Sequence, residues 1–192
     1  MVKMFLDIET LPAPESEWSK LEYLFSRKLE KSAKKKEMSE EVMMAEEKRA
    51  KFEEYILGTS FAGSFGRILC IAYALDNEEV QVICHPEDET KILREFWTIA
   101  DGVDLLVGHN VMEFDLRFIY QRSVKLTVHP SWRMNGGYND PRVLSFARYK
   151  SAPIYDTMKE WTKWNRDSIG LEHIDLALDI PTPKEGIDGS EV

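Results

Sequence analysis

The sequence predicts an α/β fold in which helices pack against a mixed β-sheet. Three patterns support this prediction: an alternating strand at the start of the chain, a β-hairpin in its middle, and a succession of helical and extended segments after the hairpin. A chain of 192 residues has room for a sizeable hydrophobic core. We therefore expect residues 1–192 to form a single domain.

The first strand is predicted at residues 4–9, because apolar and other residues alternate there until Pro12 ends the pattern. Asp7 and Glu9 are two positions apart, so both carboxylates leave the same face of the strand, about 7 Å apart. Neighbouring carboxylates repel each other unless a cation lies between them. The pair is therefore either two solvated acids on an edge strand or half of a magnesium or manganese site, since these hard ions prefer carboxylate oxygens.

A long charged segment follows at residues 15–57. It contains neither Gly nor Pro and is rich in Glu, Lys, Ala, Met and Leu, so it predicts two helices. We expect a solvated turn at Lys34–Lys36 and the start of the second helix at Ser39–Val42, where acids gather in the first turn. The alternative for this segment is a helical arm that touches a phosphate backbone.

The remainder of the chain alternates between strands and helices. The predicted strands are the two arms of the hairpin, of which the first is buried on both faces, and three shorter segments: residues 67–75, 80–84, 104–107, 143–146 and 154–155. The predicted helices follow these strands and carry apolar faces: residues 87–100, a helix from Met112, a helix from Asp156 through Trp164, and residues 170–178. Residues 125–140 are predicted to be loop.

A second group of polar residues lies at the start of the helix that follows Gly108. The preceding buried strand leads through Gly108 to Asn110 and then to Phe114 and Asp115. Asp115 is predicted at the edge of the apolar face of this helix, where an acid needs a cation, an arginine or several hydrogen-bond donors. It either pairs with Arg122, is solvated, or belongs to a metal site.

Two further residues have both a structural and a functional interpretation. Asp156 stands at a junction between a strand and a helix, so we expect it to cap the helix, with a role near bound metal ions as the alternative. His109 is predicted to be a structural hydrogen-bond donor rather than a catalytic group.

Composition excludes several classes of protein. The net charge is −9, from 25 basic and 34 acidic residues, which argues against a protein that coats nucleic acid non-specifically but not against an enzyme that grips a few nucleotides through metal ions. The longest apolar run, Ile68–Leu75, is too short to cross a bilayer. Cys70 and Cys84 are the only cysteines, so neither a disulfide framework nor a cysteine zinc site is expected. We expect a cytoplasmic protein without a membrane partner.

The opening Phe-Leu-Asp-Ile-Glu-Thr-Leu, the later Gly-His-Asn-x-x-x-Phe-Asp and the order of the elements resemble the DEDD superfamily of 3′–5′ exonucleases, which are DnaQ-like proteins with the ribonuclease H-like fold. Within it, these motifs are most similar to the branch related to family B DNA polymerase proofreading domains, and residues 65–68 and 156–158 fit that branch too. The resemblance implies a ribonuclease H-like mixed sheet flanked by helices, with residues 15–57 as a helical insertion after the first strand.

The resemblance also implies an activity. A metal-dependent 3′–5′ exonuclease would remove nucleotides from the 3′ end of single-stranded DNA or RNA, with DNA favoured, by two-metal-ion hydrolysis of the phosphodiester bond. The implied catalytic residues, which hold two Mg²⁺ or Mn²⁺ ions, are Asp7, Glu9 and Asp115. The residues implied to bind the terminal nucleotide are Thr10, Leu11, Asn110 and Phe114.

One part of the family pattern is missing. The superfamily has a third motif near its C-terminus, Tyr-x-x-x-Asp or His-x-Ala-x-x-Asp, and no Tyr or His of this sequence begins either pattern. We therefore expect that the chain is cut before the last helix of the domain and is poorly active. An apolar groove left without that helix would favour self-association.

Two other functions compete with this interpretation. A ribonuclease H-like module could bind nucleic acid or protein with little or no turnover, and an endonuclease or integrase of the same general fold is a third candidate. The joint presence of Asp7, Glu9 and Asp115 favours the exonuclease over the binding module, because an active site that no longer catalyses a reaction usually loses metal ligands. The motif Asn-x-x-x-Phe-Asp disfavours the endonuclease.

Overall fold

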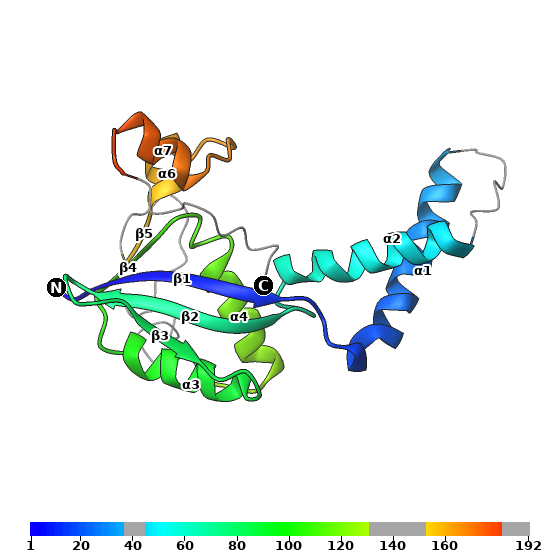
Figure 1. Ribbon diagram of the computed structural model, residues 1–192, viewed down its shortest axis with the longest axis horizontal. Helices are drawn as coiled ribbons and strands as arrows, with labels where there is room; N and C mark the ends of the chain where they lie inside the picture. The colour runs from blue at the N-terminus through cyan, green and yellow to red at the C-terminus, as the bar shows by residue number, and fades with distance from the viewer. Residues whose placement is uncertain (37–44, 131–152, 182–192) are drawn as a thin grey trace, which may run out of the picture.

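The computed structural model of the chain describes residues 1–36, 45–130 and 153–181 (Figure 1). Within these residues the centre of the fold is a five-stranded mixed sheet with the strand order β3-β2-β1-β4-β5. The strands are β1 (Lys3–Leu11), β2 (Arg67–Leu75), β3 (Gln81–Cys84), β4 (Leu105–Gly108) and β5 (Ile154–Asp156). β1 pairs antiparallel with β2 and parallel with β4. The predicted α/β class, a mixed sheet flanked by helices, is confirmed.

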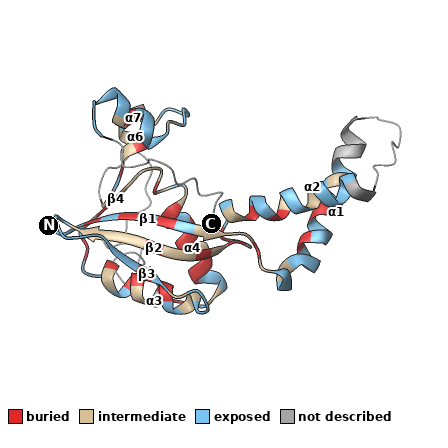
Figure 2. Cartoon of the chain, in the orientation of Figure 1, coloured by how far each residue is buried: buried red, intermediate tan, exposed pale blue. Residues whose placement is uncertain are grey.

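Two helices, α3 (Glu89–Ala100) and α4 (Asp115–Lys125), cover one face of the sheet. The core forms between them and the sheet, and Figure 2 shows the buried residues concentrated there. Both layers contribute fully buried side chains to this core. They include Met4 of β1, Ile71 of β2, and Ile92, Leu93, Phe96, Leu116, Phe118 and Ile119 of the two helices. β1 therefore has one buried face and one exposed face.

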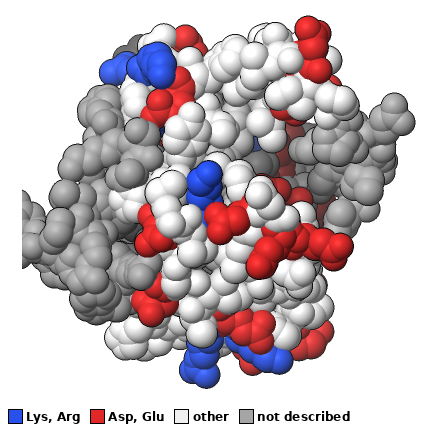
Figure 3. Space-filling model, turned by 90° about the vertical axis from the view of Figure 1, so that its left-hand side faces the viewer, with Lys and Arg blue, Asp and Glu red and all other residues white. Residues whose placement is uncertain are grey.

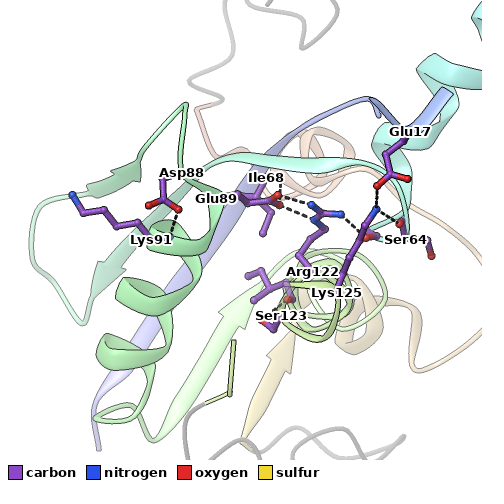
Figure 4. A network of polar contacts seen from close by, with 11 residues as sticks. Glu17, Ser64, Ile68, Asp88, Glu89, Lys91, Arg122, Ser123 and Lys125 are labelled. Atoms are coloured by element: carbon purple, nitrogen blue, oxygen red, sulfur yellow. Dashed lines mark hydrogen bonds and ion pairs between the residues drawn. The ribbon is translucent and has the colours of Figure 1, made fainter. Parts of the chain in front are cut away.

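A buried ion pair ties the two helices together (Figure 4). The Arg122 guanidinium donates to both carboxylate oxygens of Glu89, from Nε at 2.8 Å and from Nη2 at 2.6 Å. Glu89 also accepts the backbone N–H of Ile68 at 2.8 Å, and Arg122 donates to the Gly63 carbonyl at 3.3 Å. The interpretation in which Arg122 pairs with Asp115 is therefore wrong, because the guanidinium is already engaged by Glu89.

The segment between β1 and β2 forms a helical hairpin that extends away from the sheet (Figure 1). It contains η1 (Glu15–Glu17), α1 (Trp18–Lys36), α2 (Ala45–Leu57) and η2 (Gly58–Phe61), so the two predicted helices are confirmed. The ring of Phe25 lies 5.5 Å from the rings of both Phe52 and Tyr55, which joins the helices. The predicted turn at Lys34–Lys36 is wrong: these residues belong to the last turn of α1.

Two short helices follow β5, namely α6 (Thr157–Thr162) and α7 (Leu171–Ala177). α6 ends two residues earlier than predicted, because Lys163 and Trp164 have left-handed backbone conformations, with φ of 50° and 63°. In the parts of the chain described, no helix is long and apolar enough to cross a membrane.

Other element boundaries differ from the prediction in instructive ways. α4 begins at Asp115 rather than near Met112, because residues 111–114 form turns. β2 was predicted to be buried on both faces, yet only Ile68 and Ile71 of this strand are buried. Three predictions concern segments that lie wholly or largely outside the described residues: the start of the second helix at 39–42, the strand at 143–146 and the loop at 125–140.

Candidate active site

The exposed face of β1 carries the two acids predicted from the first strand. Asp7 and Glu9 are exposed, whereas Leu6 and Ile8 between and beside them are buried. The pairing of β1 with β4 runs only from Lys3 to Phe5. Beyond that point the second edge of β1 needs other partners for its backbone groups.

Asp115 supplies such a partner from the first turn of α4. Its Oδ1 accepts the backbone N–H of Ile8, the residue between Asp7 and Glu9, at 3.1 Å. The Asp115 side chain is only 2% exposed, so it lies under the sheet edge rather than at the rim of the helix face as predicted. An acid in the first turn also interacts favourably with the helix dipole.

Burial and, to a smaller extent, the nearby negative charge of Asp7 together raise the pKa of Asp115 to about 7. Burial disfavours the charged form, and a like charge nearby acts in the same direction. The structure thus brings Asp7 and Asp115 within electrostatic reach of each other, although 107 residues separate Ile8 from Asp115. The site therefore holds one carboxyl group that gains or loses its proton near neutral pH.

Asp156 is buried at the end of β5, and its carboxylate is fully engaged. Oδ1 accepts the backbone N–H groups of Met158 and Lys159, at 3.1 and 3.3 Å, which confirms the predicted cap of α6. Oδ1 and Oδ2 also accept the N–H groups of Asn110 and Met112, at 3.0 and 3.1 Å. Asp156 therefore joins α6 to the loop between β4 and α4, and this role accounts for both of its oxygens.

The loop between β4 and α4 approaches β1 closely. A Cβ atom added to Gly108 would lie 2.8 Å from the Cβ of Val111 and 2.9 Å from the Leu6 carbonyl, so this position requires glycine. Asn110 follows with a left-handed backbone, at φ 58°, and its buried Oδ1 has no hydrogen-bond partner among the described residues. Phe114 packs on Phe118 at 5.9 Å between ring centroids.

Thr10 and Leu11 lie at the far end of β1, beyond an irregularity in its pairing with β2. The register shifts between Glu9 and Thr10, as expected for a β-bulge beside a functional site. The Thr10 hydroxyl donates to the Ser60 carbonyl at 2.8 Å, which anchors the strand end to η2. Leu11 is opposite Arg67, whose buried Nε finds no acceptor in the parts of the molecule described.

Arg67 was not predicted as a site residue. The signal available in the sequence was a single basic residue directly after Phe65-Gly66, at the start of the strand that pairs with the strand carrying the acids. His109, by contrast, has the predicted structural role. Its Nε2 donates to the Ile169 carbonyl at 2.7 Å, and its Nδ1 lies 3.0 Å from the Thr157 hydroxyl.

The surface at the end of the molecule where β1 begins carries more acidic than basic side chains (Figure 3). One of the basic groups near the candidate site, Lys159, is paired with Glu113 at 3.0 Å. An acidic surface repels phosphate backbones, so contacts with nucleic acid would depend on local groups rather than on the overall field.

Comparison with known families decides the assignment. The model of the DNA polymerase family B exonuclease domain matches residues 67–165, just over half of the chain. The chain belongs to this family. The match runs from β2 past α6 and includes Asn110, Phe114, Asp115 and Asp156, whereas Asp7 and Glu9 precede it. Among curated proteins, none matches the chain.

Membership of the family B exonuclease domain confirms the resemblance and supports a nuclease-type function. Exonuclease domains of this family generally use divalent metal ions. In residues 1–36, 45–130 and 153–181, no group of three or more His, Cys, Asp or Glu side chains is gathered tightly enough to hold a metal ion. The assignment of Asp7, Glu9 and Asp115 as metal ligands therefore stays a prediction.

Proposed function

We propose that this chain is a metal-dependent 3′–5′ exonuclease that removes nucleotides from the 3′ end of single-stranded nucleic acid, with DNA favoured over RNA. Family membership supports the nuclease class. The observation that carries the finer proposal is the buried Asp115 carboxylate, hydrogen-bonded to β1 between the two exposed acids. A buried acid beside another negative charge is unfavourable as structure alone and is compensated by a bound cation.

The donor set fits hard divalent ions. Asp7, Glu9 and Asp115 offer carboxylate oxygens only, which Mg²⁺ and Mn²⁺ prefer over nitrogen and sulfur ligands. Two such ions, when bound, supply charge stabilisation at the scissile phosphate and lower the pKa of bound water. Asp115 would act as the fixed ligand, because its backbone contact to Ile8 holds the carboxylate in place.

The neighbouring residues suit a terminal nucleotide. The unpaired Oδ1 of Asn110 can accept a hydrogen bond, and the half-buried ring of Phe114 offers an apolar wall. Arg67 Nε is a donor without a protein acceptor among the described residues, and an arginine is well suited to a phosphate oxygen. Thr10 and Leu11 would line the same end of β1.

A binding module with little turnover is the second candidate. It is favoured by the absence of an assembled three-ligand cluster in the described part of the chain and by the complete engagement of Asp156. Such a module would bind a single-stranded 3′ end without cleaving it.

The two proposals are separated by a degradation assay with the 192-residue chain. Single-stranded DNA labelled at its 5′ end should shorten slowly but progressively in Mn²⁺ or Mg²⁺, and DNA labelled at its 3′ end should release labelled mononucleotide first. Asp7→Asn and Asp115→Asn should each lower the rate on the order of a thousandfold, because each removes a metal ligand.

Glu78→Gln is the matched control, since Glu78 is an exposed acid in the turn between β2 and β3. Its rate should equal that of the unchanged chain. Degradation that persists in EDTA or in Asp7→Asn would refute the metal mechanism. Tight binding of the labelled DNA without any shortening would establish the binding module instead.

A further inference from the structure

The strands β2 and β3 lie side by side as an antiparallel pair (Figure 1). In the register of this pair, Cys70 and Cys84 are directly opposite each other. Residues opposed in this way have Cα atoms about 4.5 or 5.5 Å apart, and both values fall in the range that disulfides span. Opposed side chains also leave the same face of the sheet. The backbone of the hairpin therefore places the Cα atoms of the two cysteines within the range that a disulfide can bridge.

The two thiols differ in access. Both are free, Cys84 is exposed and Cys70 is half-buried. The Cys84 Sγ lies 3.7 Å from the Leu69 carbonyl, which directs it back toward β2. Burial raises the pKa of the Cys70 thiol, and the neighbouring Cys84 and Glu9 side chains raise it as well, so the three side chains lie close together. Glu9 is itself opposite Cys70 in β1, and the row Glu9–Cys70–Cys84 thus crosses three strands on one face.

We propose that Cys70 and Cys84 form a dithiol site that hydroperoxides convert into a cross-strand disulfide beside the exposed acids of β1. This inference goes beyond the proposed nuclease function and does not depend on it. Solvent exposure assigns the role of each thiol. The exposed Cys84 thiol reacts with the oxidant, and the half-buried Cys70 thiol then reacts with the oxidised Cys84 to form the disulfide.

The reaction balances in two steps. The Cys84 sulfur attacks one oxygen of the peroxide, the O–O bond breaks, and a sulfenic acid and one water form. The Cys70 sulfur then attacks the Cys84 sulfur, the S–O bond breaks, and the hydroxide leaves as a second water with the Cys70 proton. Two thiols and one hydrogen peroxide thus give one disulfide and two waters, and a thiol reductant reverses the change.

The test uses the full chain, in which any intramolecular disulfide must join these two residues because the sequence has only two cysteines. After treatment with one equivalent of hydrogen peroxide, the intact mass should fall by two hydrogens, and neither thiol should react with an alkylating agent. Dithiothreitol should restore both thiols. A disulfide-linked dimer as the main product, or Cys70 still open to alkylation, would overturn the proposal.

A register-shifted variant is the matched control. Val82→Cys combined with Cys84→Ser moves the thiol two residues along β3, to a position opposite Ala72 and diagonal to Cys70. Diagonal neighbours lie about 7–8 Å apart, too far for a disulfide without backbone movement. Disulfide formation in the folded variant should be slower by about tenfold or more, and the difference should vanish in urea. Equal rates in the two folded chains would show that strand register does not create the site.

Discussion

The carboxylate of Asp115 accepts a hydrogen bond from the backbone N–H of Ile8 at 3.1 Å, and this contact joins the start of α4 to β1 at the position between Asp7 and Glu9. It places an acid with 2% exposure next to another negative charge. The resulting rise of the Asp115 pKa to about 7 links the stability of the fold to pH.

The first prediction concerns stability against pH. In the folded state the pKa of Asp115 is about 7, against 3.8 ordinarily, so between these values the folded state binds more protons than the unfolded state. The protonated Asp115 side chain therefore stabilises the folded state, and this contribution is fully present below about pH 4. It is lost as the pH rises to 7, and the free energy of unfolding falls by at most about 4 kcal/mol. Asp115→Asn should lack this decline. Urea unfolding at pH 4.5, 6 and 8 measures the difference in unfolding free energy between Asp115→Asn and the unchanged chain. This difference should favour the variant most at pH 8. A difference that stays the same at all three pH values would contradict the raised pKa.

The second prediction concerns added metal. On the proposed metal-dependent function, Mg²⁺ would compete with protons for the Asp115 carboxylate, so millimolar Mg²⁺ or Mn²⁺ should raise the melting temperature more at pH 8 than at pH 5. Asp115→Asn should lose most of this rise, whereas Glu78→Gln should keep it. Differential scanning fluorimetry in Ca²⁺-free buffer measures the melting temperature, and an EDTA-treated sample serves as the metal-free reference. A rise of equal size in Asp115→Asn would mean that the ions bind elsewhere.

The third prediction compares two aspartate caps. The side chain of Asp156 accepts four backbone N–H groups, whereas the side chain of Asp88, the cap of α3, accepts only that of Lys91, at 3.1 Å. Asp156→Ala should lower the free energy of unfolding by about 2–4 kcal/mol, because it removes a cap and leaves two further amides without acceptors. Asp88→Ala should cost about 1 kcal/mol. Similar costs in the two variants would show that the contacts to Asn110 and Met112 contribute nothing.

The fourth prediction concerns the ion pair beneath the site. Arg122→Leu leaves the Glu89 carboxylate buried without its cation and should cost about 3–5 kcal/mol in unfolding free energy. Adding Glu89→Gln should recover part of this loss, since glutamine is neutral and can still accept the Ile68 amide. Arg49→Ala, which breaks an exposed pair with Glu53, is the control and should change stability by about 0.5 kcal/mol or less. A double variant less stable than Arg122→Leu would contradict this account.

The sequence by itself determined most of the secondary structure. Alternation of apolar residues identified β1, and the apolar positions of residues 87–100 identified the helix that covers the sheet. These patterns are local, because a strand repeats every two residues and a helix every 3.6. Local chemistry also predicted that Asp156 would cap a helix, since its backbone position at a strand–helix junction is itself a local feature.

Only the tertiary structure decided how the acids are placed. Periodicity put Asp115 at the edge of a helix face, but the turns at 111–114 delay the helix and carry the carboxylate under β1, where Ile8 has an amide to donate. The opposition of Cys70 and Cys84 and the pairing of Arg122 with Glu89 were equally invisible, because strand register and helix packing join residues far apart in the chain. Burial and hydrogen bonding across such distances depend on the whole fold, and they set the charge state of the site.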